Sequence, residues 1–246
     1  MKNNDIYFLH IGKCGGTSID HLINQFAEKV GRKYIGFKHF DYSYISSNGT
    51  INIDIDFITM LRNPVSRAVS QFYFSKKLDW TKGLIMKNQS FYEHIRDDES
   101  MKQYTQALTD GESGSWWLSG VWKSGSWVLT DGKDSAYKER LRKEKKECLI
   151  IAARNLDKSL WFGLLEDVPR SMELLKYNLK LEDTPKLLKK NTNNYKSISD
   201  EDVKIVEKYL EGDIWLYNYS KLLFEARWNE YKGQAYIHPK LPDFNF

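Results

Sequence analysis

The sequence predicts a single three-layer α/β domain with a central, mainly parallel sheet flanked by helices. Apolar runs of strand length alternate with amphipathic helical patterns, and two of these runs lead through a short polar turn into a helix. The 246 residues suffice for one well-buried core, and no Pro/Gly/Ser-rich linker divides the chain. We therefore expect one domain spanning residues 1–246.

The first element is a strand at Ile6–Leu9, followed by a turn and a helix from Thr17 to about Val30. Apolar residues recur in this helix at the spacing of one buried face. They are Ile19, Leu22, Ile23, Phe26 and Ala27. His10 is expected to pack beside the turn at the end of the strand.

The turn between these elements has the composition of a P-loop-like phosphate cradle. Gly15 and Gly16 accept backbone angles closed to other residues and let the chain pass close to a ligand. Thr17 and Ser18 open a helix whose N–H groups and dipole favour an anion, and Lys13 adds a full positive charge. The alternative is an ordinary strand-turn-helix corner with a chance lysine.

Residue order separates this turn from a nucleoside-triphosphate loop. The Walker pattern places its lysine after the last glycine and follows it with Ser or Thr. Here Lys13 precedes Gly15 and Gly16. The order disfavours a kinase or nucleotidase.

A second unit of the same kind starts with a strand at Asp56–Leu61. Asn63 suits the N-cap and Pro64 the first position of a helix from Val65 to about Lys77. In a parallel sheet both turns would lie at the carboxyl edge of the strands, where ligands bind.

This second turn carries its own candidate anion ligands. Arg62 stands just outside the helix, while Ser66 and Ser70 are one turn apart on one face. A guanidinium and a hydroxyl can hold a phosphate, and here we select Arg62 and Ser70. The alternative is that Arg67 and Ser70 are routine surface residues.

The later chain supplies further elements. Strands are predicted at Cys148–Ala152 and Trp161–Leu165, and an amphipathic helix at Glu166–Leu179. Ser199 with Asp202 forms a capping-box pattern that opens the last long helix, through about Trp228.

Composition limits the classes of partner. The 37 basic and 33 acidic residues give a formal charge of +4, too mild for a dedicated nucleic-acid binder. Two cysteines, Cys14 and Cys148, are too few for a disulfide framework or a Cys-rich metal site, although one bridge stays open. The start of the sequence lacks a signal-peptide pattern and no run is long enough to span a membrane, so a cytoplasmic protein is expected.

The two turns together predict a nucleotide with phosphates on its 3′ and 5′ sides. That description fits 3′-phosphoadenosine 5′-phosphosulfate, with adenosine 3′,5′-bisphosphate as its product. Phe8–Thr17 resembles the 5′-phosphosulfate loop of the carbohydrate sulfotransferases, and Ile58–Arg67 resembles their 3′-phosphate motif. The likeness is closest to the heparan sulfate 6-O-sulfotransferases and more distant to the 2-O enzymes.

The resemblance continues through much of the remaining chain, at Ala153–Leu156, Phe162–Glu166 and Leu216–Phe224. It implies sulfuryl transfer to a carbohydrate hydroxyl without a metal. The few cysteines and the lack of a membrane anchor and lumenal stem depart from the family, and they favour a cytosolic bacterial or viral enzyme.

Roles follow from the resemblance and from analogy with phosphoryl transfer. Lys13 would stabilise the oxygen that leaves with the phosphate, aided by Gly15, Gly16, Thr17 and Ser18. Arg62 and Ser70 would hold the 3′-phosphate. The resemblance also implies that the loop at Lys189–Asn193, with Lys190 and Thr192, closes over the nucleotide.

The general base has two candidates. The 6-O likeness points to His21, which a gapless alignment sets one position early, and the 2-O likeness points to His39. Histidine suits the role because its unperturbed pKa lies near neutrality.

The acceptor region is expected between about Trp80 and Lys133. Four of the eight tryptophans fall within twelve residues there, and Trp116, Trp117 and Trp122 are candidates for stacking on sugar faces, with burial in the core as the alternative. Two other functions stay open: a P-loop kinase, and a catalytically silent glycan-binding relative.

Overall fold

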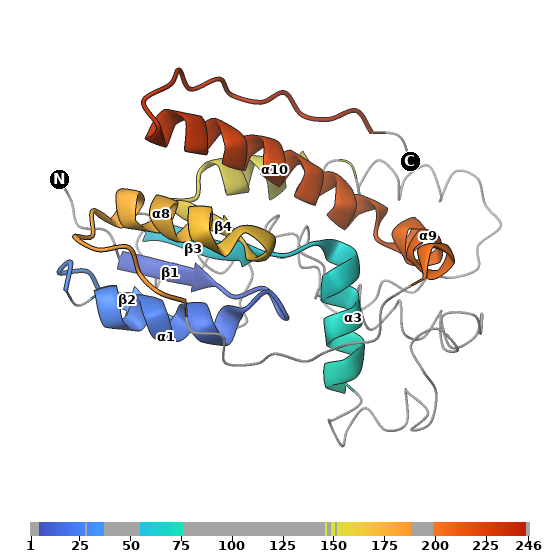
Figure 1. The fold of residues 1–246 in the computed structure, drawn as a ribbon, viewed down its shortest axis with the longest axis horizontal. Coiled ribbons are helices and arrows are strands. Elements are labelled where there is room, and N and C mark those ends of the chain that lie inside the picture. The colour runs from blue at the N-terminus through green and yellow to red at the C-terminus, as the bar shows by residue number, and fades with distance from the viewer. Residues whose placement is uncertain are drawn as a thin grey trace.

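A four-stranded, all-parallel sheet in the order β2-β1-β3-β4 organises the fold (Figure 1). The computed structural model describes residues 5–27, 29–36, 55–75, 146, 149–150, 152–187 and 199–244. Within them the strands are β1 (Asp5–Leu9), β2 (Tyr34–Ile35), β3 (Ile55–Leu61) and β4 (Trp161–Leu164). The predicted α/β class and parallel sheet are confirmed.

Helices alternate with the strands or follow them along the chain. They are α1 (Gly16–Ala27), α3 (Pro64–Ser75), α8 (Val168–Leu179), α9 (Asp200–Tyr209) and α10 (Glu211–Tyr231), with a short 3₁₀ turn, η2, at Leu165–Asp167. In Figure 1 the strands lie between α1 on one side and α10 on the other, while α8 packs on β4 and α10 contacts both. Each side of the sheet is therefore covered by helix.

The burial of the sheet explains why these strands are continuous apolar runs in the sequence. A parallel sheet covered by helices on both faces has no face exposed to solvent, so polar and apolar residues do not alternate along its strands. Tyr7, Phe8, Trp161 and Phe162 are each at most 1 % exposed, and all lie on β1 or β4. The buried face of α1 contains Ile19, Leu22, Ile23 and Ala27, as the spacing predicted.

The predicted caps form. The Asn63 carboxamide accepts the Ser66 N–H at 3.0 Å, and Pro64 opens α3. The Ser199 hydroxyl accepts the Asp202 N–H at 3.2 Å at the start of α9. Both helix starts are thus encoded locally.

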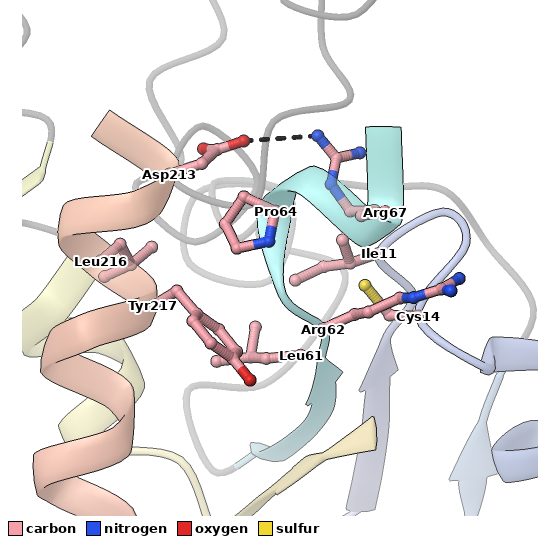
Figure 2. A pocket seen from close by; sticks show the side chains of 9 residues that line it. All are labelled: Ile11, Cys14, Leu61, Arg62, Pro64, Arg67, Asp213, Leu216 and Tyr217. Carbon is pink, nitrogen blue, oxygen red and sulfur yellow. Dashed lines mark hydrogen bonds and ion pairs between the residues drawn. The ribbon is translucent and has the colours of Figure 1, made fainter. Parts of the chain in front are cut away.

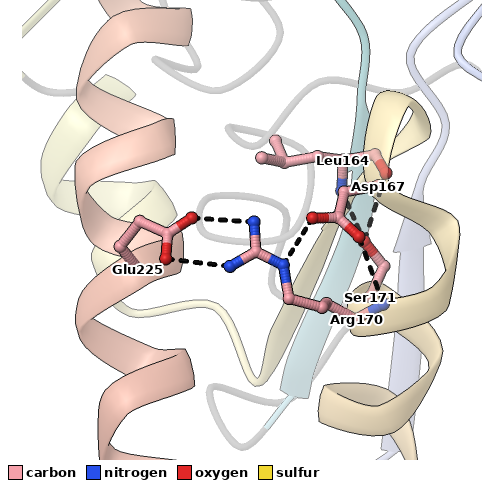
Figure 3. Close-up of polar contacts among 5 residues, drawn as sticks. All are labelled: Leu164, Asp167, Arg170, Ser171 and Glu225. Atoms are coloured by element: carbon pink, nitrogen blue, oxygen red, sulfur yellow. Dashed lines mark hydrogen bonds and ion pairs between the residues drawn. The ribbon is translucent and has the colours of Figure 1, made fainter.

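The link between β4, α8 and α10 is polar (Figure 3). Ser171 donates to the Leu164 carbonyl and accepts its N–H, fixing α8 to the end of β4. Arg170 pairs with Asp167 at the start of α8 and with Glu225 on α10, the latter at 2.8 Å. One arginine therefore spans the gap between the two helices.

Two predictions of elements are wrong. The described residues at 149–150 and 152–157 are helical, whereas a strand was predicted at Cys148–Ala152. Leu149, Ala152, Ala153 and Leu156 are all buried, at the i, i+3, i+4, i+7 spacing of a helix face. The apolar run at Cys148–Ala152 contains the start of this buried helix face. The helical spacing becomes visible only when Ala153 and Leu156 are included.

The last long helix is two helices. Leu210 leaves helical geometry, with φ −106° and ψ 16°, between α9 and α10. Its side chain is buried, and Gly212 lies two residues later, so packing and the low helix propensity of glycine favour a bend here. The two-residue strand β2 was not predicted either. In the described part of the chain, no helix has both the length and the apolar character needed to cross a membrane.

Candidate functional site

Strand register brings the two predicted turns to one edge of the sheet. β1 and β3 are parallel neighbours in which Leu9 lies opposite Thr59, and the Thr59 hydroxyl donates to the Leu9 carbonyl at 2.9 Å. Each strand then ends in a turn and a helix, α1 or α3. The prediction that both turns share the carboxyl edge is confirmed.

The first turn has the backbone shape of an anion cradle. Lys13 and Gly15 both have left-handed backbone, with φ of 63° and 79°. The N–H groups of Ser18 and Ile19 fold back on the Gly15 carbonyl at 3.0 and 3.2 Å. The N–H groups of Gly16 and Thr17 precede that first bond, so the helix itself offers them no acceptor.

Gly16 is required by a close approach. A Cβ placed there would stand 1.8 Å from the His10 ring, which is buried and stacks on Phe8 with 5.5 Å between ring centroids. The expectation that His10 packs beside the turn is confirmed. The His10 ring thus packs directly against the backbone of the first turn at Gly16.

The second turn is tied to the first. The Arg62 guanidinium donates from Nη1 to the Lys13 carbonyl at 3.1 Å. This bond joins the positions that carry the two predicted cationic ligands, 49 residues apart in the chain. The two turns therefore form one connected surface.

Two residues of α3 lie deeper than a surface helix would place them. Arg67 is 2 % exposed and Ser70 is 5 % exposed, so the alternative in which both are routine surface residues is wrong. Arg67 donates from Nη2 to Asp213 of α10 at 3.3 Å. Because Arg67 and Ser70 are three residues apart in a helix, they lie on the same face of α3.

A pocket opens between the two turns and α10 (Figure 2). Its lining residues are Ile11, Cys14, Leu61, Arg62, Pro64, Arg67, Asp213, Leu216 and Tyr217. In Figure 2, Arg67 and Asp213 face each other at one end of this group and Tyr217 lies at the other. The lining thus includes two arginines, one aspartate and one tyrosine.

Cys14 also lines this pocket, and its thiol interacts electrostatically with the charged residues. Burial raises the pKa of its thiol to about 12, the carboxylates of Glu166 and Asp213 act in the same direction, and Arg67 and Arg62 oppose them. The thiol is therefore protonated near neutral pH and is not a nucleophile. Cys14 is a free thiol.

Glu166 is a residue that the sequence-based site omitted. One carboxylate oxygen accepts the Asn63 N–H at 2.9 Å, and the other accepts the Tyr217 hydroxyl at 2.8 Å. Burial raises the pKa of Tyr217, and its hydrogen bond to Glu166 raises it further, so the phenol stays a donor. In the sequence, the signal for this role was that Glu166 directly follows the predicted buried strand Trp161–Leu165, which ends at the same edge of the sheet.

The candidate bases and acceptor ligands divide into two groups. His21 is exposed on α1, one helical turn after Thr17, and its Nε2 lies 3.1 Å from the Gln25 amide nitrogen. His39, Lys190, Thr192, Trp116, Trp117 and Trp122 lie outside the described residues. Of the two predicted bases, only His21 has a described position.

Comparison with known proteins adds no relative to this geometry. No protein-family model matches the chain, and no curated protein matches it.

Proposed function

We propose that this protein is a sulfotransferase that transfers a sulfuryl group from 3′-phosphoadenosine 5′-phosphosulfate to a carbohydrate hydroxyl. The hydrogen bond from Arg62 to the Lys13 carbonyl carries the proposal. It makes one surface from two strand-to-helix turns, each with a cation and a helix start. A donor with anionic groups on both sides of its ribose would engage both turns.

The residues of the first turn fit a phosphate-sized anion. Gly16 has no side chain, and one added there would collide with His10, so no side chain from this position covers the start of α1. The left-handed backbone at Lys13 and Gly15 folds the turn over that start. Peptide N–H groups and a lysine are typical ligands of such an anion.

The second turn offers a guanidinium and a hydroxyl on a capped helix. Arg62 is half-buried, and, unlike Arg67, it forms no ion pair with a carboxylate among the described residues. Its charge is therefore available to a ligand at the start of α3. This supports assigning the 3′-phosphate to Arg62 and Ser70.

The chemistry requires charge stabilisation and removal of a proton. When bound, the donor supplies a sulfuryl group whose bond to the phosphate oxygen breaks as a bond to the acceptor oxygen forms. Lys13 stabilises the negative charge left on the phosphate. A histidine accepts the proton of the acceptor hydroxyl, and His21 and His39 are the candidates.

Nucleotide preference tests the proposal directly. Calorimetry should show tighter binding of adenosine 3′,5′-bisphosphate than of ATP with Mg²⁺. Preference for ATP with Mg²⁺ would indicate a P-loop kinase instead.

Transfer is then tested with ³⁵S-labelled donor and a panel of polysaccharides, followed by mass analysis of the product. Label should appear in a sulfate ester of one polysaccharide class. His21→Ala and His39→Ala assayed in parallel identify the base, since only the base variant should lose turnover while binding nucleotide normally. Nucleotide binding without transfer to any hydroxyl acceptor would instead indicate a silent glycan-binding protein.

A further inference from the structure

Arg67 combines deep burial with incomplete hydrogen bonding. Its side chain is 3 % exposed, and Nη2 donates to Asp213 at 3.3 Å, near the long limit of a hydrogen bond. Among the residues that the structure describes, Nη1 has no hydrogen-bond partner. A buried guanidinium normally has its remaining protons satisfied, because leaving them unpaired is costly.

Another arginine of the same protein shows the usual pattern. Arg227 of α10 donates from Nη1 to Ser159, and from Nη2 to the Asp157 carbonyl at 2.7 Å. Both terminal nitrogens of the Arg227 guanidinium therefore have protein acceptors. Arg67 differs because its Nη2 has a carboxylate acceptor while its Nη1 has no acceptor among the described residues.

The position of Arg67 in the pocket indicates which kind of acceptor its Nη1 could bind. Arg67 lines the pocket between the two turns together with Arg62, and both cations act on the Cys14 thiol there. Ser70 lies on the same face of α3, three residues further on. An anion held by Arg62 and Ser70 would therefore border the Arg67 guanidinium.

Among the described residues, the carboxylates of Asp213 and Glu166 beside this pocket already accept hydrogen bonds. Asp213 accepts from Arg67 itself, and Glu166 accepts from Asn63 and Tyr217. These contacts direct the carboxylates onto protein donors. A tetrahedral oxyanion is an acceptor whose geometry suits guanidinium groups.

We propose that Arg67 is a second arginine ligand of the 3′-phosphate, with Nη1 donating to a phosphate oxygen and Asp213 orienting the guanidinium through Nη2. The inference rests on the proposed function. It assigns the buried arginine of α3 to specificity for a 3′-phosphorylated nucleotide, beside the predicted Arg62 and Ser70.

The test compares two nucleotides on matched variants. Calorimetry measures the dissociation constants of adenosine 3′,5′-bisphosphate and adenosine 5′-monophosphate for the parent, Arg67→Gln and Arg227→Gln. Loss of a charge-assisted bond should weaken bisphosphate binding of Arg67→Gln by about 10- to 100-fold. Monophosphate binding should change by less than about 3-fold, and the Arg227 variant should keep the parental ratio.

Arg67→Lys covers the case in which the glutamine variant does not fold. Its ammonium retains the ion pair with Asp213 but lacks the second arm of the fork, so the same selective loss is expected. Equal weakening of both nucleotides, or no weakening, overturns the inference and leaves the proposed function standing. A parent protein that shows no preference for the bisphosphate overturns the proposed function, and this inference with it.

Discussion

Glu166 accepts the Tyr217 hydroxyl at 2.8 Å while its other carboxylate oxygen accepts the Asn63 N–H at 2.9 Å. One side chain after β4 therefore connects α10 to the turn that carries Arg62. The bond matters because Asn63 also caps α3 through its own side chain. Glu166 thus positions the second turn without being a predicted ligand.

Removing the Glu166 carboxylate should destabilise the protein more than removing the phenol hydroxyl. Glu166→Ala leaves two donors without their acceptor and should cost about 1–3 kcal/mol of unfolding free energy, against about 1 kcal/mol for Tyr217→Phe. Urea denaturation measures both, and the double variant measures their coupling. Additive effects of the two substitutions would contradict a shared hydrogen bond. Glu166→Ala should also weaken binding of the bisphosphate, measured by calorimetry.

The sequence predicted the parts of this site that depend on local chemistry. Gly15, the Asn63 cap and the strand ends at Leu9 and Leu61 are short-range features, and the structure has each of them. The roles of Glu166 and Asp213 depend on contacts 51 and 146 residues away in the chain, with Tyr217 and Arg67. No local pattern encodes such pairs. The helical period of residues 149–150 and 152–157 was hidden for a similar reason, because the five apolar residues at 148–152 fit either a strand or a helix.

Gly16→Ala should disrupt the first turn, because its Cβ would meet the buried His10 ring at 1.8 Å. We expect a loss of about 1–3 kcal/mol in unfolding free energy together with weaker nucleotide binding. The companion variant His10→Ala removes the obstructing ring at the cost of a cavity. In the double variant the collision is gone, so its destabilisation should be smaller than the sum of the two single effects. A simple sum would show that the ring is not the obstacle.

Two ion pairs that reach α10 in the described part of the chain should differ in energy because they differ in burial. Asp213 is 5 % exposed as the partner of Arg67, and Glu225 is 53 % exposed as the partner of Arg170. Asp213→Asn should cost about 3–5 kcal/mol, since it leaves a buried guanidinium without its counter-charge. Glu225→Gln should cost less than about 1 kcal/mol. Chemical denaturation measures the loss of unfolding free energy in both variants. A larger loss for Glu225→Gln than for Asp213→Asn would contradict the prediction.

The buried Cys14 thiol should make stability fall at alkaline pH. Its pKa in the folded protein is raised to about 12 by burial, whereas an unfolded cysteine ionises near about 8.5. Between these values the unfolded chain binds fewer protons, so the unfolding free energy falls as pH rises. At pH 10 the effect of this one group is about 2 kcal/mol relative to pH 8.

Cys14→Ala isolates that contribution. Urea denaturation under reducing conditions should show a smaller drop in unfolding free energy between pH 8 and 10 for the variant than for the parent. Burial also raises the pKa of Tyr219 to about 12, which adds a decline in the same direction to both proteins. Equal drops in the two proteins would mean that the Cys14 thiol ionises as freely in the folded state as in the unfolded chain.

Lys13 and Arg62 should separate by kinetics, although a hydrogen bond joins their turns. Lys13 acts on charge that develops in the transition state, so Lys13→Ala should lower kcat by about 10²- to 10³-fold with little change in nucleotide affinity. Arg62→Ala should instead weaken bisphosphate binding by about 10- to 100-fold. Because Lys13 has a positive φ, Lys13→Asn is the matched variant, since asparagine tolerates left-handed backbone. It should lose turnover equally if the lost ammonium is the cause.

Lys158→Ala is the control for removing a positive charge. Lys158 is exposed and precedes β4, at the amino edge of a parallel sheet, opposite the two turns. Its removal should change neither kcat nor nucleotide affinity, because salt screens an exposed charge at the opposite edge of the sheet from the two turns. Near-normal turnover in both Lys13 variants would remove Lys13 from the chemistry and leave it as a charge at the entrance of α1. The contrast between Lys13 and Arg62 therefore tests whether the first turn carries the reacting group and the second only holds the nucleotide.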